Sequence, residues 1–469
     1  PILVAWAAKQ LATSVHWRAS RSDEFESGNH GRGGYLQGTL WVDKEGRFSH
    51  LQTDTRFFAG HWLPFSVVAP ALNSARLLPG PYALASVDLH AQVQQSHTNA
   101  TNIYRGAGRP EACLLMERLI DEAAAKLGMD PLAIRLKNFI PAAQMPYPTA
   151  AGQRLDSGDF AALLNSCAKA FGYAGRRQAQ AQGRAADAFT VKGIGIACFT
   201  EPCGTGFESA TVRLHEDGSV EVMSGSADQG QGHSASFAAI AAEVLGCSPS
   251  AVRVVEGDTA ACPVGVGALA SRSIAIGGSA VQQAAQAVMA LQAKRDRALS
   301  YPLEATVNYT PAAEAWSAGC TMAEVALDVE TGEIEVVQIC MTDDAGRIIS
   351  PQLAHGQLLG GAAQGLGQAL LERLVFAPSG QLLTGSLMDY AIPRASDMPP
   401  IAISHLPTLT SANTLQAKGV GEAGTIGVPA AILNAVCDAV RQLDASIDTT
   451  SLSFPLTSEK MWNLLNSKT

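Results

Sequence analysis

The chain has 469 residues, of which 47% are hydrophobic and 16% charged, with 44 Gly and 23 Pro. This length predicts two to four domains of about 150 residues, and the composition excludes intrinsic disorder for most of the chain. A net charge of −9 without a run of Lys or Arg argues against a nucleic-acid partner. No apolar stretch reaches the roughly 18 to 20 residues of a membrane span, and residues 1–6 lack the basic region of a signal peptide. We therefore expect a soluble protein.

The cysteines are scattered and form no CxxC pair. Their odd number and irregular spacing argue against a disulfide framework, a structural zinc site or an iron–sulfur cluster built from this chain alone. Free thiols favour a reducing compartment, so we expect the cytoplasm, with the periplasm as the alternative for an enzyme that folds before export. The positions are 113, 167, 198, 203, 247, 262, 320, 340 and 437.

In chain order, residues 1–8 have the pattern of the middle of an apolar element. Such an element exposes large side chains unless another segment covers it, namely those of Ile2, Leu3, Val4 and Trp6.

Strands are predicted at residues 34–42 and 85–93, because both segments are bounded by turn residues. Residues 110–128 predict a helix, since apolar residues recur three and four apart and a glycine stands at the expected end. Asp130 and Pro131 are typical of the cap and first residue of a second helix.

Residues 172–187 are small and polar, which predicts an exposed helix or a linker. Two hairpins follow, at residues 210–224 and 322–337, each with alternating strands around a glycine-containing turn. Strand-rich halves that each lead into a Gly-rich turn and a helix predict an α+β fold.

Gly-rich turns are the chemically informative part of the sequence, because glycine lets the backbone approach a ligand closely. Three of five such turns open predicted helices, and bare amides at helix N-termini bind anions. The turns are residues 105–108, 203–206, 228–233, 276–279 and 419–427.

Residues 219–258 imitate a GxGxxA dinucleotide fingerprint, which would indicate an NAD-linked dehydrogenase. The first glycine lies about five residues beyond the predicted strand, whereas the fingerprint places it in the tight turn. That interpretation is therefore kept only as a remote alternative.

Five motifs occur in an order that resembles the molybdenum-binding large subunit of the xanthine dehydrogenase and aldehyde oxidase family. The resemblance covers essentially the whole chain and leaves the substrate open. The motifs are Tyr-Arg-Gly-Ala-Gly-Arg-Pro-Glu (104–111), Asp-Gln-Gly-Gln-Gly-His (228–233), Ser-Arg-Ser-Ile-Ala-Ile-Gly-Gly-Ser (271–279), Gly-Gly-Ala-Ala-Gln-Gly-Leu-Gly (360–367) and Lys-Gly-Val-Gly-Glu-Ala-Gly (418–424).

The resemblance implies two mixed α/β molybdopterin-binding subdomains. Residues 1–150 would be the C-terminal part of the first, 151–190 a helical connection or linker, and 191–469 the second, with the catalytic glutamate. It also implies a Mo-molybdopterin, commonly the cytosine dinucleotide in bacterial members. An aldehyde or N-heteroaromatic carbon would be oxidised with oxygen from water. Electrons would leave through [2Fe–2S] clusters and FAD on partner subunits.

Glu422 matches the family's catalytic base. No cation stands within three residues of it, so a desolvated carboxylate on this turn suits general-base chemistry. Without the motif, an exposed turn glutamate would be the simpler interpretation.

The resemblance also assigns cofactor-binding positions. Arg105 and Gln231 have simpler alternatives, a surface ion pair and a side chain capping the next helix. The hydroxyl and guanidinium donors of residues 271–273 suit phosphate oxygens, although a capped helix would have the same residues. The assigned positions are Arg105, Gly106, Gln229, Gly230, Gln231, Gly232, Ser271, Arg272, Ser273, Gly419, Val420 and Gly421.

Phe199 lies in the segment where xanthine-oxidising relatives place an aromatic ring on the substrate, and a core phenylalanine is the alternative. His30, His233 and His355 have no metal-ligand spacing, so ordinary hydrogen-bonding roles are expected, and the metal would be held by molybdopterin without protein side chains.

Two departures from the family pattern are informative. Relatives that oxidise carbon monoxide carry a copper-holding cysteine in the loop matching residues 104–108, and this loop has none, which disfavours CO oxidation. Relatives also have a Gly-Gly-Gly-Phe-Gly-Gly motif just before the segment matching Pro1. We expect another chain or segment to supply it. A non-catalytic cofactor-carrier or assembly subunit remains an alternative, against which an intact Glu422 and Gln231 argue.

Overall fold

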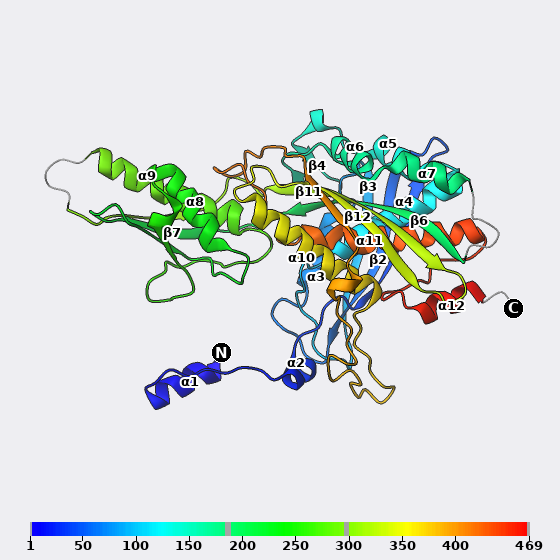
Figure 1. Cartoon of the computed structure of the whole chain (residues 1–469), viewed down its shortest axis with the longest axis horizontal. Helices are drawn as coiled ribbons and strands as arrows, with labels where there is room; N and C mark the ends of the chain where they lie inside the picture. The colour runs from blue at the N-terminus through cyan, green and yellow to red at the C-terminus, as the bar shows by residue number, and fades with distance from the viewer. Residues whose placement is uncertain (1, 183–188, 295–299, 467–469) are drawn as a thin grey trace.

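The computed structural model describes residues 2–182, 189–294 and 300–466. Figure 1 shows a smaller lobe at one end, drawn in green, joined to a larger lobe that contains both the N-terminal and the C-terminal parts of the chain. The chain therefore leaves the large lobe after β6 (Thr190–Pro202), builds the small lobe, and returns at β11 (Trp316–Asp328).

The small lobe is a four-stranded sheet in the order β10-β7-β8-β9, covered by helices α8 and α9. Its core is made of alternating strand residues such as Val212 and Val222, which meet the helix residues Phe237 and Val281. The elements are β7 (Glu208–Leu214), β8 (Val220–Ser224), α8 (His233–Leu245), η2 (Pro249–Ala251), β9 (Val252–Val255), the π-helical turn η3 (Ser273–Gly278), α9 (Ser279–Ala293) and β10 (Leu303–Tyr309).

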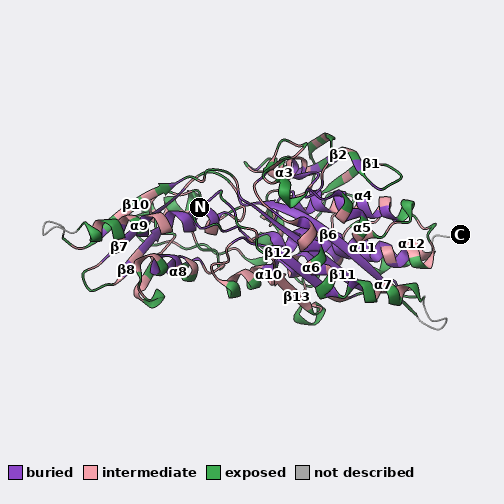
Figure 2. Cartoon of the chain, turned by 90° about the horizontal axis from the view of Figure 1, so that it is seen from above, coloured by how far each residue is buried: buried purple, intermediate pink, exposed green. Residues whose placement is uncertain are grey.

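The centre of the large lobe is a sheet in the order β13-β12-β11-β6, which is buried on both faces (Figure 2). On β6, Ile194 and Ile196 pack toward the α6 side, whereas Ala197 and Phe199 pack toward α11. The elements are α6 (Phe160–Phe171), β12 (Ile334–Asp344), α10 (Pro351–Leu370), β13 (Ile401–His405) and α11 (Ala423–Leu443).

A third sheet, in the order β1-β2-β3, lies on the same lobe and is covered by α3 and α4. Its elements are β1 (Gly34–Val42), β2 (Phe48–Gly60), α3 (Ala69–Leu77), β3 (Ser86–Gln95), α4 (Arg109–Leu127) and α5 (Pro131–Asn138). The remaining elements are α1 (Ile2–Leu11), α2 (Arg21–Ser27), η1 (Ala142–Gln144), β4 (Tyr147–Pro148), β5 (Arg154–Leu155), α7 (Tyr173–Ala181), η4 (Ala395–Asp397) and α12 (Ser458–Asn466).

Most of the local predictions are confirmed. Helix α4 ends at Gly128, which has a left-handed φ of 63°, and Asp130 accepts hydrogen bonds from the backbone amides of Leu132 and Ala133. Both predicted hairpins form antiparallel pairs, β7 with β8 and β11 with β12. The polar segment begins as the helix α7, and residues 183–187 of that prediction lie outside the described residues.

The segment that imitates a dinucleotide fingerprint does form a strand–helix–strand unit, because β8 and β9 are parallel and α8 connects them. The same β8 also pairs with β7 as the expected hairpin. Gly230 lies six residues after the last residue of β8, Ser224, so the glycines are remote from the tight turn that a dinucleotide site requires.

The expected apolar element at the N-terminus is the helix α1, which has no buried residue and stands away from the large lobe (Figure 1). Three of the large side chains are strongly exposed, with Ile2 84%, Leu3 79% and Trp6 60% accessible.

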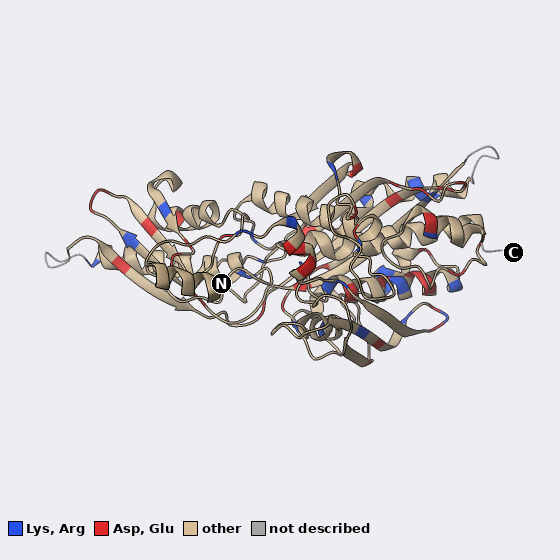
Figure 3. Ribbon diagram, turned by 90° about the horizontal axis from the view of Figure 1, so that it is seen from below, with Lys and Arg blue, Asp and Glu red and all other residues tan. Residues whose placement is uncertain are grey.

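Two helical stretches, residues 273–293 and 423–443, are long and apolar enough to span a membrane by length and composition alone. The sequence had predicted no stretch of this length. The second is 94% buried inside the protein, as expected for the core helix α11. Figure 3 shows that Lys and Arg are dispersed along the chain among acidic residues, and that most of the ribbon carries neither.

Candidate functional site

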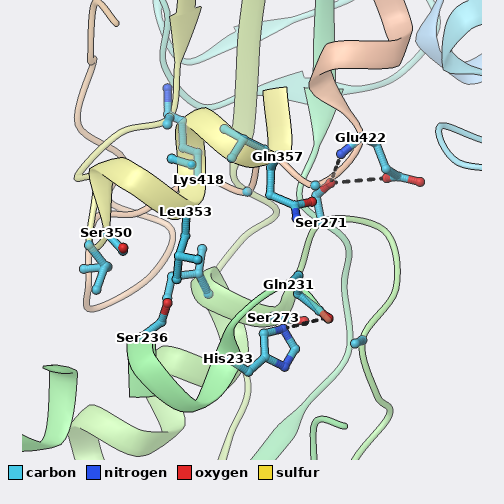
Figure 4. Close-up of a pocket in the computed structure, with 18 of the residues that line it drawn as sticks. Gln231, His233, Ser236, Ser271, Ser273, Ser350, Leu353, Gln357, Lys418 and Glu422 are labelled. Atoms are coloured by element: carbon cyan, nitrogen blue, oxygen red, sulfur yellow. Dashed lines mark hydrogen bonds between the residues drawn. The ribbon is translucent and has the colours of Figure 1, made fainter. Parts of the chain in front are cut away.

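A pocket of about 570 Å³ lies where the two lobes meet. The small lobe contributes residues 229–236 and 268–274, and the large lobe contributes residues 345–357 and 418–422, together with Arg105. Figure 4 shows Ser271 beside Glu422 and Gln231 beside His233 among the side chains that line this pocket. Its volume is in the range of small-molecule and cofactor sites.

Several helices begin at this pocket. The first turns of α8, η3 and α10 line it, and α11 begins directly after the lining segment 419–422. Ser350, the residue before α10, makes no side-chain hydrogen bond to cap the helix. Because each helix N-terminus presents unpaired amides and a partial positive charge, this convergence favours an anionic ligand with several phosphate or carbonyl oxygens.

Two glycines permit this backbone arrangement. Gly230 has a φ of 95°, which favours glycine, and an added Cβ would have nothing within 4 Å. The backbone of Gly230 is therefore accessible where it lines the pocket. Gly419 lies against the Ser271 carbonyl, where an added Cβ would be 1.7 Å from the oxygen. Only glycine therefore lets the 419–422 segment pass this close to residue 271.

The carboxylate of Glu422 lies at one end of the pocket, just before α11, and is 9% exposed. Its Oε1 accepts a hydrogen bond from the Gly106 amide at 2.9 Å, and its Oε2 accepts one from Ser271 Oγ at 3.3 Å. The Arg109 guanidinium lies 3.5 Å from Oε2. The sequence window around Glu422 held no cation within three residues, whereas the fold brings this one from α4.

Ser271 lies in a strained segment of the backbone. Ala270 and Ser271 have φ values of 51° and 55°, which non-glycine residues adopt at a cost and usually at functional sites. In this conformation Ser271 Oγ accepts a hydrogen bond from the Glu422 amide at 3.1 Å. The same hydroxyl is also in hydrogen-bonding contact with the carboxyl of Glu201, a fully buried residue of β6.

Glu201 was missed by the sequence analysis. Burial is the main cause that raises the pKa of its carboxyl to about 8, and the charge of Glu422 is the second. The signal that could have found it is a single acidic residue inside an otherwise apolar and small-residue strand. Burying such a residue costs free energy, so a buried acidic residue in a strand of this kind is a candidate for a functional role.

Gln231 is oriented by a chain of side chains. Its Oε1 accepts from the Gln229 amide at 2.6 Å, and its Nε2 lies 2.9 Å from His233 Nε2 (Figure 4). An amide nitrogen can only donate, so His233 Nε2 accepts and its Nδ1–H donates to Glu256 at 3.1 Å. The structure thus confirms a hydrogen-bonding role for His233, and Gln231 organises its own turn.

Arg105 is not the surface ion pair that was its alternative. Its Nε donates to the Gly421 carbonyl at 2.6 Å, and its two terminal nitrogens donate to Gln364 and Gln357. The guanidinium therefore fixes the segment before Glu422 against α10. Gly106 is placed by the same turn, where its amide reaches Glu422.

Lys418 also lines the pocket, although its charge is used elsewhere. Its Nζ is fully buried and lies 2.6 Å from Asp344 Oδ2 and 2.9 Å from Thr408 Oγ1. This buried pair anchors the first residue of the 418–422 segment to the end of β12.

Two expectations are wrong. Arg272 does not face the pocket: it is fully buried, forms an ion pair with Glu208 and donates to the Phe207 carbonyl, because residue 271 turns the next side chain into the small lobe. Phe199 does not reach the pocket either, being 3% exposed in the core between β6 and α11. The core alternative is the correct one.

The other predicted positions meet at the site. Gly232 is the residue before α8, and an added Cβ there would meet Leu353 of α10 at 2.8 Å. The remaining predicted residues line the pocket: Gln229, Gly230, Gln231, Ser271, Ser273, Gly419, Val420 and Gly421.

The donor set fits a molybdopterin. Among the described residues that line the pocket, Glu422 is the one carboxylate, whereas amides, hydroxyls and the guanidinium of Arg347 are donors. Such donors match phosphate and pterin oxygens and would repel no anion except near Glu422. In the part of the chain that the structure describes, no group of three or more His, Cys, Asp or Glu could hold a metal ion.

Comparison with known families gives the same cofactor. Residues 1–139 match one molybdopterin cofactor-binding domain, and residues 166–301 and 292–399 match a second domain with this description.

Known relatives extend the likeness over nearly the whole chain. The carbon monoxide dehydrogenase large chain of Hydrogenophaga pseudoflava is 30% identical over 97% of this chain and 63% of its own length. The nicotine 6-hydroxylase large subunit of Paenarthrobacter nicotinovorans is 27% identical over 98% of this chain and 63% of its own. The chain thus spans less than two thirds of the length of these relatives.

Solved structures share the fold. Quinoline 2-oxidoreductase from Pseudomonas putida 86 matches with a TM-score of 0.91 and 29% identity, over 99% of this chain and 66% of that chain. The Cu,Mo-containing CO dehydrogenase in its carbon monoxide reduced state matches with a TM-score of 0.92 and 25% identity, over 99% of this chain and 65% of that one.

Proposed function

Because the chain belongs to the molybdopterin cofactor-binding domain family, we propose that it is the molybdenum-binding subunit of a molybdenum hydroxylase with Glu422 as general base. The observation that carries the proposal is a carboxylate at the end of a pocket on which helix N-termini converge. The bound molybdenum cofactor would supply the oxidation of a substrate carbon with oxygen from water. This assignment also leaves the NAD-linked alternative without support.

This chain's own residues would prepare that chemistry. The first turns of α8 and α10, with Gln231, Ser273 and Ser350, would bind the anionic cofactor (Figure 4). The Gly106 amide and Ser271 orient the Glu422 carboxylate toward the pocket. Glu422 would accept the proton that the activated oxygen nucleophile loses, which is the role of a general base. The cytosine dinucleotide form is proposed because the pocket has a volume of about 570 Å³ and is lined by residues of both lobes.

The substrate class follows from the apolar part of the lining. Ile348, Leu353, Val420 and Leu269 surround the polar groups and suit an aldehyde or an N-heteroaromatic ring. The loop at residues 104–108 contains no cysteine, and Cys113 is buried in α4 with its thiol toward the Cys198 carbonyl. No thiol of that loop would hold copper, so we favour an organic substrate over carbon monoxide.

The partners are proposed from the relatives, which are named as large chains and subunits of complexes. Iron–sulfur and FAD subunits would receive the electrons. The exposed apolar residues of α1 support a further chain or segment, carrying the Gly-rich Phe motif, that packs on this helix. The nine free cysteines support the cytoplasm as the compartment.

The decisive variant is Glu422→Gln, which keeps the shape of the side chain and removes the base. We expect full molybdenum content and turnover reduced by at least ~100-fold, the low end for general-base catalysis. Glu330→Gln, in the exposed hairpin turn after β11, is the matched control. Normal turnover of the Glu422 variant would leave the carrier or assembly role as the better description.

A further inference from the structure

One serine hydroxyl stands between two carboxyl groups at the base of the pocket. Ser271 Oγ is in hydrogen-bonding contact with Glu201 Oε1 and lies 3.3 Å from Glu422 Oε2. The two glutamates come from β6 and from the segment before α11, so the tertiary fold alone brings them together. Glu201 is fully buried, and of the two described hydroxyls that contact its carboxyl, those of Ser271 and Ser317, that of Ser271 lines the pocket.

The number of protons in this arrangement limits what it can do. A serine hydroxyl has one proton to donate, whereas two ionised carboxylates would both have to accept it. One of the two carboxylate oxygens that face Ser271 would then lack this donor, and two negative charges would lie close together in a buried site, which costs free energy. A proton on Glu201 removes the conflict, because the carboxyl O–H can donate to Ser271 Oγ while the hydroxyl donates to Glu422.

We propose that Glu201 is a positioning residue for Glu422, which in its protonated form donates to Ser271 and thereby directs the Ser271 hydroxyl to the Glu422 carboxylate. The two glutamates are thus unequal: Glu201 holds the proton and Glu422 remains ionised and oriented toward the pocket. This inference rests on the proposed function, because it explains how the general base keeps its charge and direction.

The surroundings of the pair favour this division. Arg109 of α4 lies 3.5 Å from Glu422, which also accepts from the Gly106 amide, so the ionised form is stabilised at residue 422. The Glu201 carboxyl contacts the Ser271 hydroxyl and lies 3.4 Å from the Ser317 hydroxyl. The charge of Arg109 also acts on Glu201 and lowers its pKa, but burial and the charge of Glu422 outweigh that effect. Burial raises the pKa of Glu201 to about 8, which is consistent with a proton at neutral pH.

Other titratable groups that act on this cluster come from the elements packed against it. Arg105 lies on the turn before α4, Cys203 follows β6, and Asp343 lies on β12. Burial raises the pKa of Cys203 to about 12, so this thiol stays neutral through the same range. Burial and the charge of Glu201 raise the pKa of Asp343, so this carboxyl needs its own control.

The ionisation of Glu201 sets the direction of the pH dependence. Below a pH of about 8 Glu201 is protonated and serves as a donor, and above it Glu201 ionises and competes with Glu422 for the Ser271 proton. Turnover of the holoenzyme should therefore fall on the alkaline side with a midpoint near that value. Glu201→Gln carries an amide donor at every pH, so we expect this alkaline fall to be absent in the variant.

The test compares wild type, Glu201→Gln and Glu201→Met holoenzymes over about pH 6 to about pH 10. Glu201→Met removes the donor at similar volume, and we expect turnover to be about tenfold below that of Glu201→Gln, the effect of one hydrogen bond. If the Met variant does not fold, the profiles of wild type and Glu201→Gln decide alone. An alkaline fall that persists in Glu201→Gln would overturn the inference.

Infrared spectroscopy gives a readout that does not depend on turnover. One component of the protonated-carboxyl absorption should be present at neutral pH, should be lost in Glu201→Gln, and should remain in Asp343→Asn, which removes the absorption of Asp343 itself, and in Glu422→Gln. Loss of the band in Glu422→Gln alone would place the proton on the wrong glutamate and overturn the inference. Normal turnover of Glu422→Gln refutes the proposed function, whereas an unchanged band in Glu201→Gln refutes only this inference.

Discussion

The polar residues of the pocket are positioned by contacts between residues that are far apart in the sequence. Glu422 and the Gly106 amide are 316 positions apart, and Lys418 is 74 positions from Asp344. Each of these contacts fixes one point of the segment that carries Glu422. At the scale of single residues, the conformation of the segment that carries Glu422 therefore depends on these few buried polar contacts.

The buried pair of Lys418 and Asp344 can be tested for this role. Lys418→Met leaves the fully buried Asp344 carboxylate without its cation, which should lower the free energy of unfolding by about 3–5 kcal/mol. The partly exposed pair of Arg213 and Glu304 is the control, where Arg213→Met should cost about 0.2–1 kcal/mol. Urea unfolding measures both, and equal small effects would show that the buried pair does not anchor the segment.

Close packing between helices positions the base at the next scale. Helix α10 crosses α11 near Gly361 and Gly424, and an added Cβ at Gly361 would lie 2.7 Å from the Gly424 Cα. Glu422 stands just before α11, so the spacing of these two helices sets the depth at which its carboxylate enters the pocket.

Helix α10 offers a matched pair of glycines for measuring this effect. Gly361→Ala forces α10 and α11 apart and should destabilise the protein by about 1–3 kcal/mol. Gly356→Ala, on the exposed side of the same helix with nothing within 4 Å, should stabilise it by about 0.5–1 kcal/mol, because glycine weakens helices. Thermal unfolding distinguishes the two, and effects of the same sign would contradict the packing argument.

For the whole molecule, we propose a division of the cofactors among subunits: this chain holds the molybdenum cofactor, and partner subunits hold the iron–sulfur clusters and FAD. The nine cysteines are unpaired and scattered over both lobes, and seven of them are buried. The isolated polypeptide should therefore show no iron–sulfur or flavin absorbance, whereas the native complex should show both. Iron in stoichiometric amount in this chain alone, measured by metal analysis, would refute the division.

The sequence by itself determined the local structure and most of the segments that line the pocket. Helix caps such as Asp130, turn glycines such as Gly128 and the alternation of the two hairpins are governed by neighbouring residues, so they could be predicted without a fold. The ordered motifs also predicted which segments meet, including residues 229–231 and 419–422, since a motif preserves a local backbone shape that a cofactor requires.

Only the tertiary structure decided what each side chain in those segments does. Arg272 and Ser271 are adjacent, yet one is buried against Glu208 and the other faces Glu422, because two left-handed residues reverse the backbone there. Phe199 and Glu201 lie on the same strand, and the register of β6 against β11 and α11 buries the ring in the core while it brings the carboxyl to Ser271. Such contacts join residues tens to hundreds of positions apart, and no local pattern encodes them.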